Sequence, residues 1–267
     1  TEIYTLSLHD ALPISHRLGL QMSMNLSTSD GSLRAPWETS AQAPKALAWT
    51  SAEFVGPARV SCVMPPRRGP LAWDVALLAA RIGSAEEAAS PGSSPQRESE
   101  IRFDSDPKQW RPVNAPLAGD ASALEVVDLT GEVDSQGRLA WNAGPGRWRI
   151  LRFLYTVARS SRDVDMLDAA AVEAYFRRFL GIVAEDGGPL VGKTLTHVYS
   201  VSWEGATPTW SAGFEAEFAR YRGYALRPYL PVLAGITVDS PEISRRFVRD
   251  YSRTLSDCFM HNCYGRL

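Results

Sequence analysis

Apolar residues recur at helical spacing in the C-terminal third of the chain. The longest such run lies after Asp168, at i, i+3, i+4, i+7 and i+11: Val172, Tyr175, Phe176, Phe179 and Val183. This spacing puts the apolar side chains on one face of an amphipathic helix. Asp168 is a residue type that favours the N-cap position. Gly187-Gly188-Pro189 predicts the end of the helix, and the segment LTHVYSVSWEG is predicted as a strand that leaves into a loop.

Two more helices are predicted beyond that strand. Ser211 is the expected cap of the first and Gly223 its expected stop, and the buried stripe comprises Phe214, Phe218 and Tyr221.

The second of these helices has a strong start signal. Pro241 suits the first helical position, and Asp239 with Glu242 has the spacing of a capping box. Its predicted apolar face comprises Ile243, Phe247, Tyr251, Leu255 and Phe259.

The middle of the chain has the pattern of strands and turns instead. EFVGPARVSCVMP and AWDVALLAARI are predicted strands. A β meander is predicted after them, with turns at Ser135-Gln136-Gly137 and Gly144-Pro145-Gly146. Before this region, Gly19 is a helix stop, and a buried strand is expected over residues 18–24. That strand runs into a polar loop at residues 25–34.

Strands and helices of these lengths, in this order, indicate an α/β fold. We predict part of a (β/α) TIM-like barrel that is interrupted by an all-β insertion. The predicted domains are a barrel segment over residues 16–48, the β-rich insertion over 49–160 and a second barrel segment over 161–267, which continues beyond the fragment.

The first residues have a different origin in our interpretation. TEIYTLSLHDALPI matches the in-frame translation of a common short-read sequencing adapter, so residues 1–15 are interpreted as an assembly artefact rather than a natural N-terminus. Pro13 also interrupts the only apolar run there, which argues against a regular helix. Both ends of the sequence are abrupt, and we expect an internal fragment of a longer protein.

Charge and composition exclude several classes of function. The net charge of −2 gives no support for a nucleic-acid partner. No apolar run approaches the roughly 20 residues that span a bilayer. Three cysteines are an odd number without metal-ligand spacing, which argues against a disulfide framework.

Glu204 is the sharpest candidate for catalysis. It lies just past the end of a predicted strand, where barrel enzymes place catalytic residues. Trp203 could form an apolar wall beside it, which would raise the pKa of the carboxyl group and keep it protonated as a general acid requires. The structural alternative is a solvated loop carboxylate or a helix cap.

The remaining candidates have weaker patterns. Asn25, Asp30 and Trp37 could line a polar sugar pocket, although a turn at Asp30 and a core position for Trp37 are the plainer alternatives. Asp163 and Asp165, two residues apart before a helix, could hold a hard cation or sugar hydroxyl groups. The plainer alternative is that they are acids at a helix start, favoured there by the helix dipole.

One histidine has a structural interpretation. His197 lies within a strand pattern and is expected to be a buried, hydrogen-bonded core residue rather than a base.

Several segments together resemble glycoside hydrolase family 106, the α-L-rhamnosidase-like enzymes. They are the stretch from GPLVGKTLTHVYSVSWEG to SRTLSD, PWETSAQAPKALAWTSAEFVGPARV, and GRLAWNAGPGRWRILRF. The resemblance covers nearly the whole chain after residue 15, with the segments in the right order.

The resemblance implies a (β/α) barrel with additional β domains, inverting hydrolysis of terminal α-L-rhamnosides, and calcium in the active site. The family's Ser-Trp-Glu segment matches Ser202, Trp203 and Glu204, which implies that Glu204 is the general acid. Asp163 and Asp165 align with an acidic segment of the family, so they are the expected metal ligands. The partner base is expected C-terminal of Leu267, and a secreted or periplasmic location is expected.

Two departures from the family concern the sugar pocket. Val201 stands where relatives usually carry Asp, and the loop after Asn25 is poorer in Gly and Trp than in relatives. The alternatives are therefore a catalytically inactive relative that binds carbohydrate, and a barrel glycosidase with a different sugar specificity, including a retaining one.

Overall fold

The structure, a computed structural model, describes residues 8–25, 42–64, 72–83, 97–100, 111–112, 121–157, 164–199 and 208–266. The chain divides into two compact units. The first comprises Thr1–Pro44, Ala158–Thr207 and Met260–Leu267, and the second comprises Lys45–Val157 and Pro208–Phe259. The second unit therefore combines the predicted β-rich region with two of the predicted helices. The predicted domain boundaries themselves stay a prediction.

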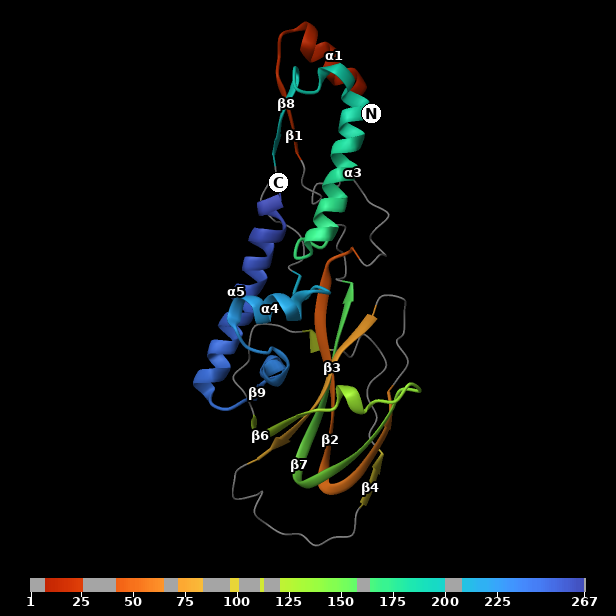
Figure 1. Ribbon diagram of the computed structural model, residues 1–267, viewed down its shortest axis with the longest axis vertical. Coiled ribbons are helices and arrows are strands. Elements are labelled where there is room, and N and C mark those ends of the chain that lie inside the picture. The colour runs from red at the N-terminus through yellow and green to blue at the C-terminus, as the bar shows by residue number, and fades with distance from the viewer. Residues whose placement is uncertain are drawn as a thin grey trace, which may run out of the picture. The chain divides into compact units, whose positions relative to one another are not determined.

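The first unit contains a parallel pair of strands. Its elements are α1 (Leu8–Arg17), β1 (Met22–Asn25), α3 (Ala169–Gly187), η3 (Gly188–Leu190), β8 (Leu195–Tyr199) and η5 (Tyr264–Arg266). β1 and β8 lie side by side (Figure 1) and pair in parallel, with Asn25 opposite Tyr199. The backbone N–H of Met22 also donates to the carbonyl of Thr194, at 2.7 Å, just before β8 begins.

The predicted helix after Asp168 is confirmed as α3. The Asp168 carboxylate accepts hydrogen bonds from the amides of Ala170 and Ala171, so it satisfies two backbone donors at the helix start. Tyr175 and Phe179 are buried, as the helical spacing predicts. The helix ends at Gly187, and the next residue, Gly188, has a φ of 48°.

Two expectations for the N-terminal segment are wrong. Residues 8–17 form helix α1 although Pro13 lies inside it, because Leu12 is buried and packs toward Gly187 of α3. Tertiary packing here outweighs the hydrogen bond that proline cannot donate. The strand is also shorter than expected, since Leu18 and Leu20 still donate to carbonyls of the helix end and β1 begins only at Met22.

A six-strand path forms the sheet of the second unit, in the order β4-β2-β7-β3-β6-β9, with β5 pairing with β2 outside this path. The strands are β2 (Lys45–Val63), β3 (Ala72–Ile82), β4 (Arg97–Glu100), β5 (Arg111–Pro112), β6 (Ala121–Asp128), β7 (Arg138–Val157) and β9 (Ile236–Thr237). β2 and β7 pair in antiparallel fashion along nearly their whole lengths. The predicted strands EFVGPARVSCVMP and AWDVALLAARI are thus confirmed.

The predicted turn at Gly144-Pro145-Gly146 is wrong, because β7 continues through it. Gly146 lies opposite Gly56 of β2, and the register shifts there. A Cβ atom on Gly56 would lie 2.1 Å from the carbonyl oxygen of Gly144, so only glycine allows this close backbone approach. The same glycine-rich signal can therefore mark a bend inside a long strand pair.

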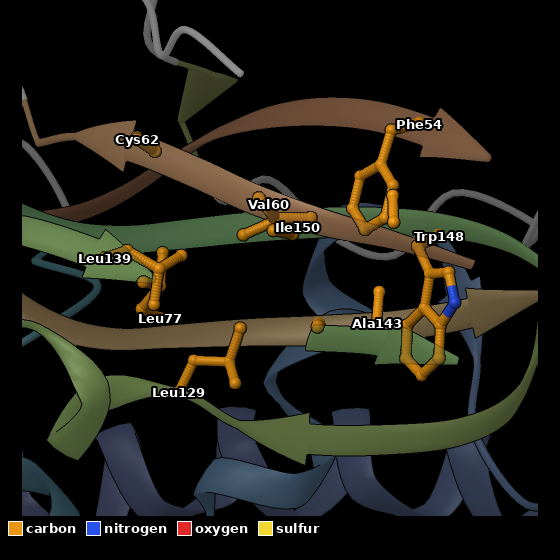
Figure 2. Packing of buried hydrophobic residues seen from close by; sticks show 11 residues of the cluster. Phe54, Val60, Cys62, Leu77, Leu129, Leu139, Ala143, Trp148 and Ile150 are labelled. Atoms are coloured by element: carbon orange, nitrogen blue, oxygen red, sulfur yellow. The ribbon is translucent and has the colours of Figure 1, made fainter. Parts of the chain in front are cut away.

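The bent sheet encloses an apolar core. Figure 2 shows Val60, Leu77, Leu139 and Ile150 among the buried side chains of this core. All four are at most 3% exposed. Trp148 closes one end of this cluster, and its indole N–H donates to the carbonyl of Gly144 at 2.9 Å.

Aromatic residues link the second unit's helices to the sheet. The helices are α4 (Phe214–Arg222), η4 (Arg227–Ala234) and α5 (Pro241–Asn262), and η2 (Thr130–Glu132) follows β6. Trp210 lies between Tyr155 of β7 and Phe214 of α4, with ring centroids 6.2 and 5.2 Å apart. Phe214 in turn contacts Tyr251 of α5 at 5.0 Å, and the Tyr251 hydroxyl donates to the carbonyl of Thr209.

The helix caps differ from those expected. Gly213, not Ser211, precedes α4, and the buried Ser211 hydroxyl makes no capping bond. Pro241 begins α5 as predicted, but the Ser240 hydroxyl accepts the Ile243 amide at 3.1 Å and is the cap. Asp239 instead has a φ of 59° and accepts the Tyr229 hydroxyl.

The buried stripe of α5 is rotated from the predicted one. Phe247 and Tyr251 are buried as expected, but Ile243 is 41% exposed. The buried positions are Ser244, Phe247, Tyr251, Thr254 and Cys258. Ser244 is buried because its hydroxyl bonds both the amide and the carbonyl of Val238. A polar residue thus occupies a place that hydrophobic spacing alone gives to an apolar one.

The fold is a mixed α/β arrangement, and the described strands close no barrel. The parallel β1–β8 pair, with α3 before β8, has the order of a β/α repeat. The prediction of a TIM-like barrel is therefore supported only as far as the α/β class.

Ile150→Ala should destabilise the second unit by about 2–5 kcal/mol, because the deleted atoms leave a cavity in a close-packed core. Ile150 is 0% exposed. Urea unfolding followed by tryptophan fluorescence measures the change. Val55→Ala is the control, since Val55 is 70% exposed and should cost no more than about 0.5 kcal/mol. Equal costs for the two variants would contradict the assigned core.

Candidate active site

The candidate site lies at the carboxyl edge of the β1–β8 pair. Asn25 is the last residue of β1 and Tyr199 the last of β8, and the two are partners in the parallel register. The carboxyl ends of parallel strands meet at one edge of a sheet, where open α/β sheets and barrels bind ligands. The chain segments that leave β1 and β8 therefore start from the same edge.

The segment after β8 in the sequence carries the predicted general acid. Ser202, Trp203 and Glu204 follow Tyr199 within five positions in the sequence. All three lie outside the residues that the structure describes, as does Val201. The role of Glu204 therefore stays a prediction. The structure shows only where β8 ends, five residues before Glu204 in the sequence.

The strand pair has two faces of different character. Partners in a parallel register project to the same face, and successive residues project to opposite faces. Ser23 with His197, and Asn25 with Tyr199, are on one face. Met24 with Val198 is on the other.

The expectation that His197 is a core residue is wrong. His197 is exposed, and its Nδ1 lies 2.8 Å from the Thr196 hydroxyl. Tyr199, beside it on the same face, is 49% exposed. Sequence reasoning missed both as site residues. The i, i+2 spacing puts Ser23 with Asn25 on one face of β1, and His197 with Tyr199 on one face of β8. The register of the two strands is needed to show that both pairs share the same face of the sheet.

The other predicted substrate and metal residues are only partly placed. Asn25 is half-buried at the end of β1. Asp30, Trp37 and Asp163 lie outside the described residues. Of the predicted pocket, the structure thus places Asn25 alone, and of the predicted metal pair, Asp165 alone.

Asp165 has a clear structural role. Its side chain is fully buried, and Oδ1 accepts the amide of Leu167 at 3.1 Å. Its own amide donates to the carbonyl of Gln42 at 2.7 Å, and its carbonyl accepts the Asp168 amide. These bonds join the segment before β2 to the start of α3 and set the position of the Asp168 cap.

The described residues do not by themselves make a calcium site. Calcium takes six to eight oxygen ligands, whereas no group of three or more His, Cys, Asp or Glu in the described ranges is placed to hold a metal ion. Asp165 contributes one carboxylate that already accepts a backbone amide. Calcium stays a prediction, and no chemical step is derived through it.

The three cysteines are placed as buried structural residues. Cys62, Cys258 and Cys263 are all buried and form no disulfide, as the odd count predicts. Burial raises the pKa of the Cys263 thiol to about 11, so the reactive thiolate is scarce at neutral pH. The Cys263 sulfur lies 3.3 Å from that of Met166.

Asp165→Ala should lower the stability of the first unit by about 1–3 kcal/mol, because it leaves the buried Leu167 amide without its acceptor. Asp168→Ala, which removes only the helix cap, is the comparison, at about 0.5–2 kcal/mol. Thermal unfolding with and without millimolar calcium measures both. A calcium-dependent rise in the unfolding temperature that only Asp165→Ala abolishes would refute the purely structural role.

No helix within the described ranges has the length and apolarity to cross a membrane. This agrees with the absence of a long apolar run in the sequence.

Comparisons with known proteins place the chain in a family. The sequence model of that family, described as alpha-L-rhamnosidase in glycoside hydrolase family 106, matches residues 101–267, which include Asp165 and Glu204. A protein of Formosa agariphila named "Putative beta-glucuronidase" is 36% identical over an alignment of 151 residues, which covers 53% of this chain and 13% of that protein.

A solved structure has a similar fold. The rhamnosidase from Novosphingobium sp. PP1Y matches with a TM-score of 0.67 at 19% identity, over 100% of this chain and 39% of that one. The chain thus spans well under half the length of either relative. Since the family match covers more than half of the 267 residues, the chain belongs to the α-L-rhamnosidase family of glycoside hydrolases, family 106.

Proposed function

We propose that the chain is part of an inverting glycoside hydrolase that cleaves terminal α-L-rhamnosides, with Glu204 as its general acid. The observation that carries this proposal is the register of β1 and β8. Because Asn25 and Tyr199 are partners, the loop with Glu204 and the loop after Asn25 begin at one edge of the sheet. A carboxyl group and a hydrogen-bonding amide can there converge on one sugar.

The proposed chemistry needs two carboxyl groups. Glu204 donates a proton to the glycosidic oxygen as its bond to the anomeric carbon breaks, and a second carboxylate takes a proton from the attacking water. Inversion requires the two groups to be about 6.5–9.5 Å apart, so that water fits between carboxylate and sugar. A separation of about 5–5.5 Å would favour a retaining enzyme.

We also propose that β1 and β8 are neighbouring strands of a (β/α) barrel. Their parallel pairing, the position of α3 in the chain before β8, and the likeness of the fold to that of the Novosphingobium rhamnosidase support this assignment. Calcium near Asp163 and Asp165 stays a prediction from the family resemblance.

A glucuronide specificity is the second candidate. It is favoured by the name of the Formosa agariphila relative, a β-glucuronidase, at 36% identity. A glucuronide carries a carboxylate on the sugar ring, whereas rhamnose carries a methyl group there. The two substrates therefore differ in charge as well as in shape, and parallel assays separate them.

The role of Glu204 can be tested through the leaving group. A general acid helps most when the leaving alcohol is a poor one, so Glu204→Gln should lower kcat for an alkyl or disaccharide α-L-rhamnoside by about 10²–10⁴-fold. It should change kcat far less for the 2,4-dinitrophenyl glycoside, whose phenolate leaves without a proton. The assay uses the longest reading frame that contains this chain, with the glucuronides run in parallel.

Glu217→Gln is the matched control, since Glu217 lies on α4 and pairs with Arg220 at the surface. It should leave kcat within about twofold. An equal loss on all leaving groups in Glu204→Gln would contradict the general-acid role. Absence of any hydrolysis by the unmodified protein, with sugar binding retained, would favour the inactive carbohydrate-binding relative.

A further inference from the structure

The polar face of the β1–β8 pair carries chemistry that the assignment of Glu204 does not use. This face comprises Ser23, Asn25, His197 and Tyr199, and we refer to it as the β1–β8 polar face. Strands of parallel sheets are ordinarily buried on both sides and are apolar on both. One side of this pair carries a hydroxyl group, an amide, an imidazole and a phenol. An apolar core excludes such polar groups, whereas a polar ligand requires them.

We infer that the β1–β8 polar face binds the sugar ring whose glycosidic bond is cleaved, with His197 and Tyr199 as positioning residues for its hydroxyl groups. This inference rests on the proposed function and adds two binding residues to it.

The size of the face fits one monosaccharide. Residues i and i+2 of a strand are about 7 Å apart, and neighbouring strands are about 5 Å apart. Four side chains at these spacings cover an area that a single pyranose ring can fill. Asn25 and Tyr199 end their strands at the carboxyl edge, so a ring bound on this face lies at the edge after which Glu204 follows in the sequence.

The environment of His197 suits a hydroxyl ligand. Its Nδ1 is held by the Thr196 hydroxyl at 2.8 Å, and Nε2 has no hydrogen-bond partner within the described ranges. Whichever ring nitrogen carries the proton, Nε2 can donate to or accept from a hydroxyl group, which itself does both. The side chain is exposed within the described part of the chain.

Tyr199 supplies the complementary kind of contact. It is 49% exposed and ends its strand at the carboxyl edge. An aromatic ring has an apolar face that can cover the C–H groups of a sugar, and a hydroxyl that can bond to its oxygens. Val198 projects to the opposite face and has neither property.

The test compares His197→Ala with Val198→Thr, which changes the opposite face of the same strand. Hydrolysis of 4-nitrophenyl α-L-rhamnopyranoside and of its monodeoxy analogues is measured for each. Loss of one neutral hydrogen bond corresponds to about 2–12-fold, so His197→Ala should lower kcat/KM by that factor, and Val198→Thr should leave it within twofold. Tyr199→Phe, which keeps the ring and removes the hydroxyl, should give a smaller loss.

The deoxy analogues separate contact from structure. One analogue should be a poorer substrate for the unmodified protein by the same factor, and His197→Ala should not discriminate against it further. A His197→Ala variant that retains normal kcat/KM, or that loses it equally on every analogue, would overturn the inference while the proposed function stands. Failure of the unmodified protein to hydrolyse or bind the rhamnoside, measured by ligand-observed NMR, would overturn the proposed function and with it this inference.

Discussion

The parallel pairing of β1 with β8 is the constraint on which the candidate site depends. These strands are far apart in the sequence, and the pairing brings Asn25 and Tyr199 into register at one edge. Parallel strands need a crossover connection, and here α3 is its last helix before β8. The cap at Asp168 and the buried Asp165 fix where that helix starts. The edge from which the segment with Glu204 starts is thus set by contacts that lie away from it.

The second unit satisfies a different requirement, since its mostly antiparallel sheet must bury one large apolar cluster. β2 and β7 bend where Gly56 meets Gly146, and the bent strands enclose the cluster around Ile150. Aromatic side chains from Trp210 to Tyr251 connect the sheet to the helices. Glycine allows the two strands to approach closely at the bend, and large aromatic rings pack between the sheet and the helices. Both features help to bury the apolar surface of a twisted sheet.

The elements of the fold were largely predictable, and their ends were not. The spacing of Tyr175 and Phe179 identifies a helix, because the helical period of about 3.6 residues puts both side chains on one buried face. Cap positions were displaced by one or two residues, because Ser240 and Asp239 are adjacent residues that can both cap. The glycine pattern at 144–146 was misjudged, because the same residues permit a turn or a bend. Pairings between distant segments, such as β6 with β9, leave no local signal in the sequence.

The site was predictable in part. The position of Glu204 after a strand was visible in the sequence, and the structure fixes the end of that strand at Tyr199. The exposure of His197 was not visible, because a histidine in a strand pattern suits a core as well as a ligand face. Register decides between these alternatives, and register depends on the partner strand.

A crystal structure of Glu204→Gln with a bound alkyl α-L-rhamnoside tests the central claim most directly. We predict that the sugar ring covers Asn25 and His197, with its glycosidic oxygen within about 2.6–3.2 Å of the residue 204 amide, which is hydrogen-bond reach for a proton donor. A sugar bound away from the carboxyl edge of β1 and β8, or a residue 204 side chain directed away from it, would contradict the assignment of the site.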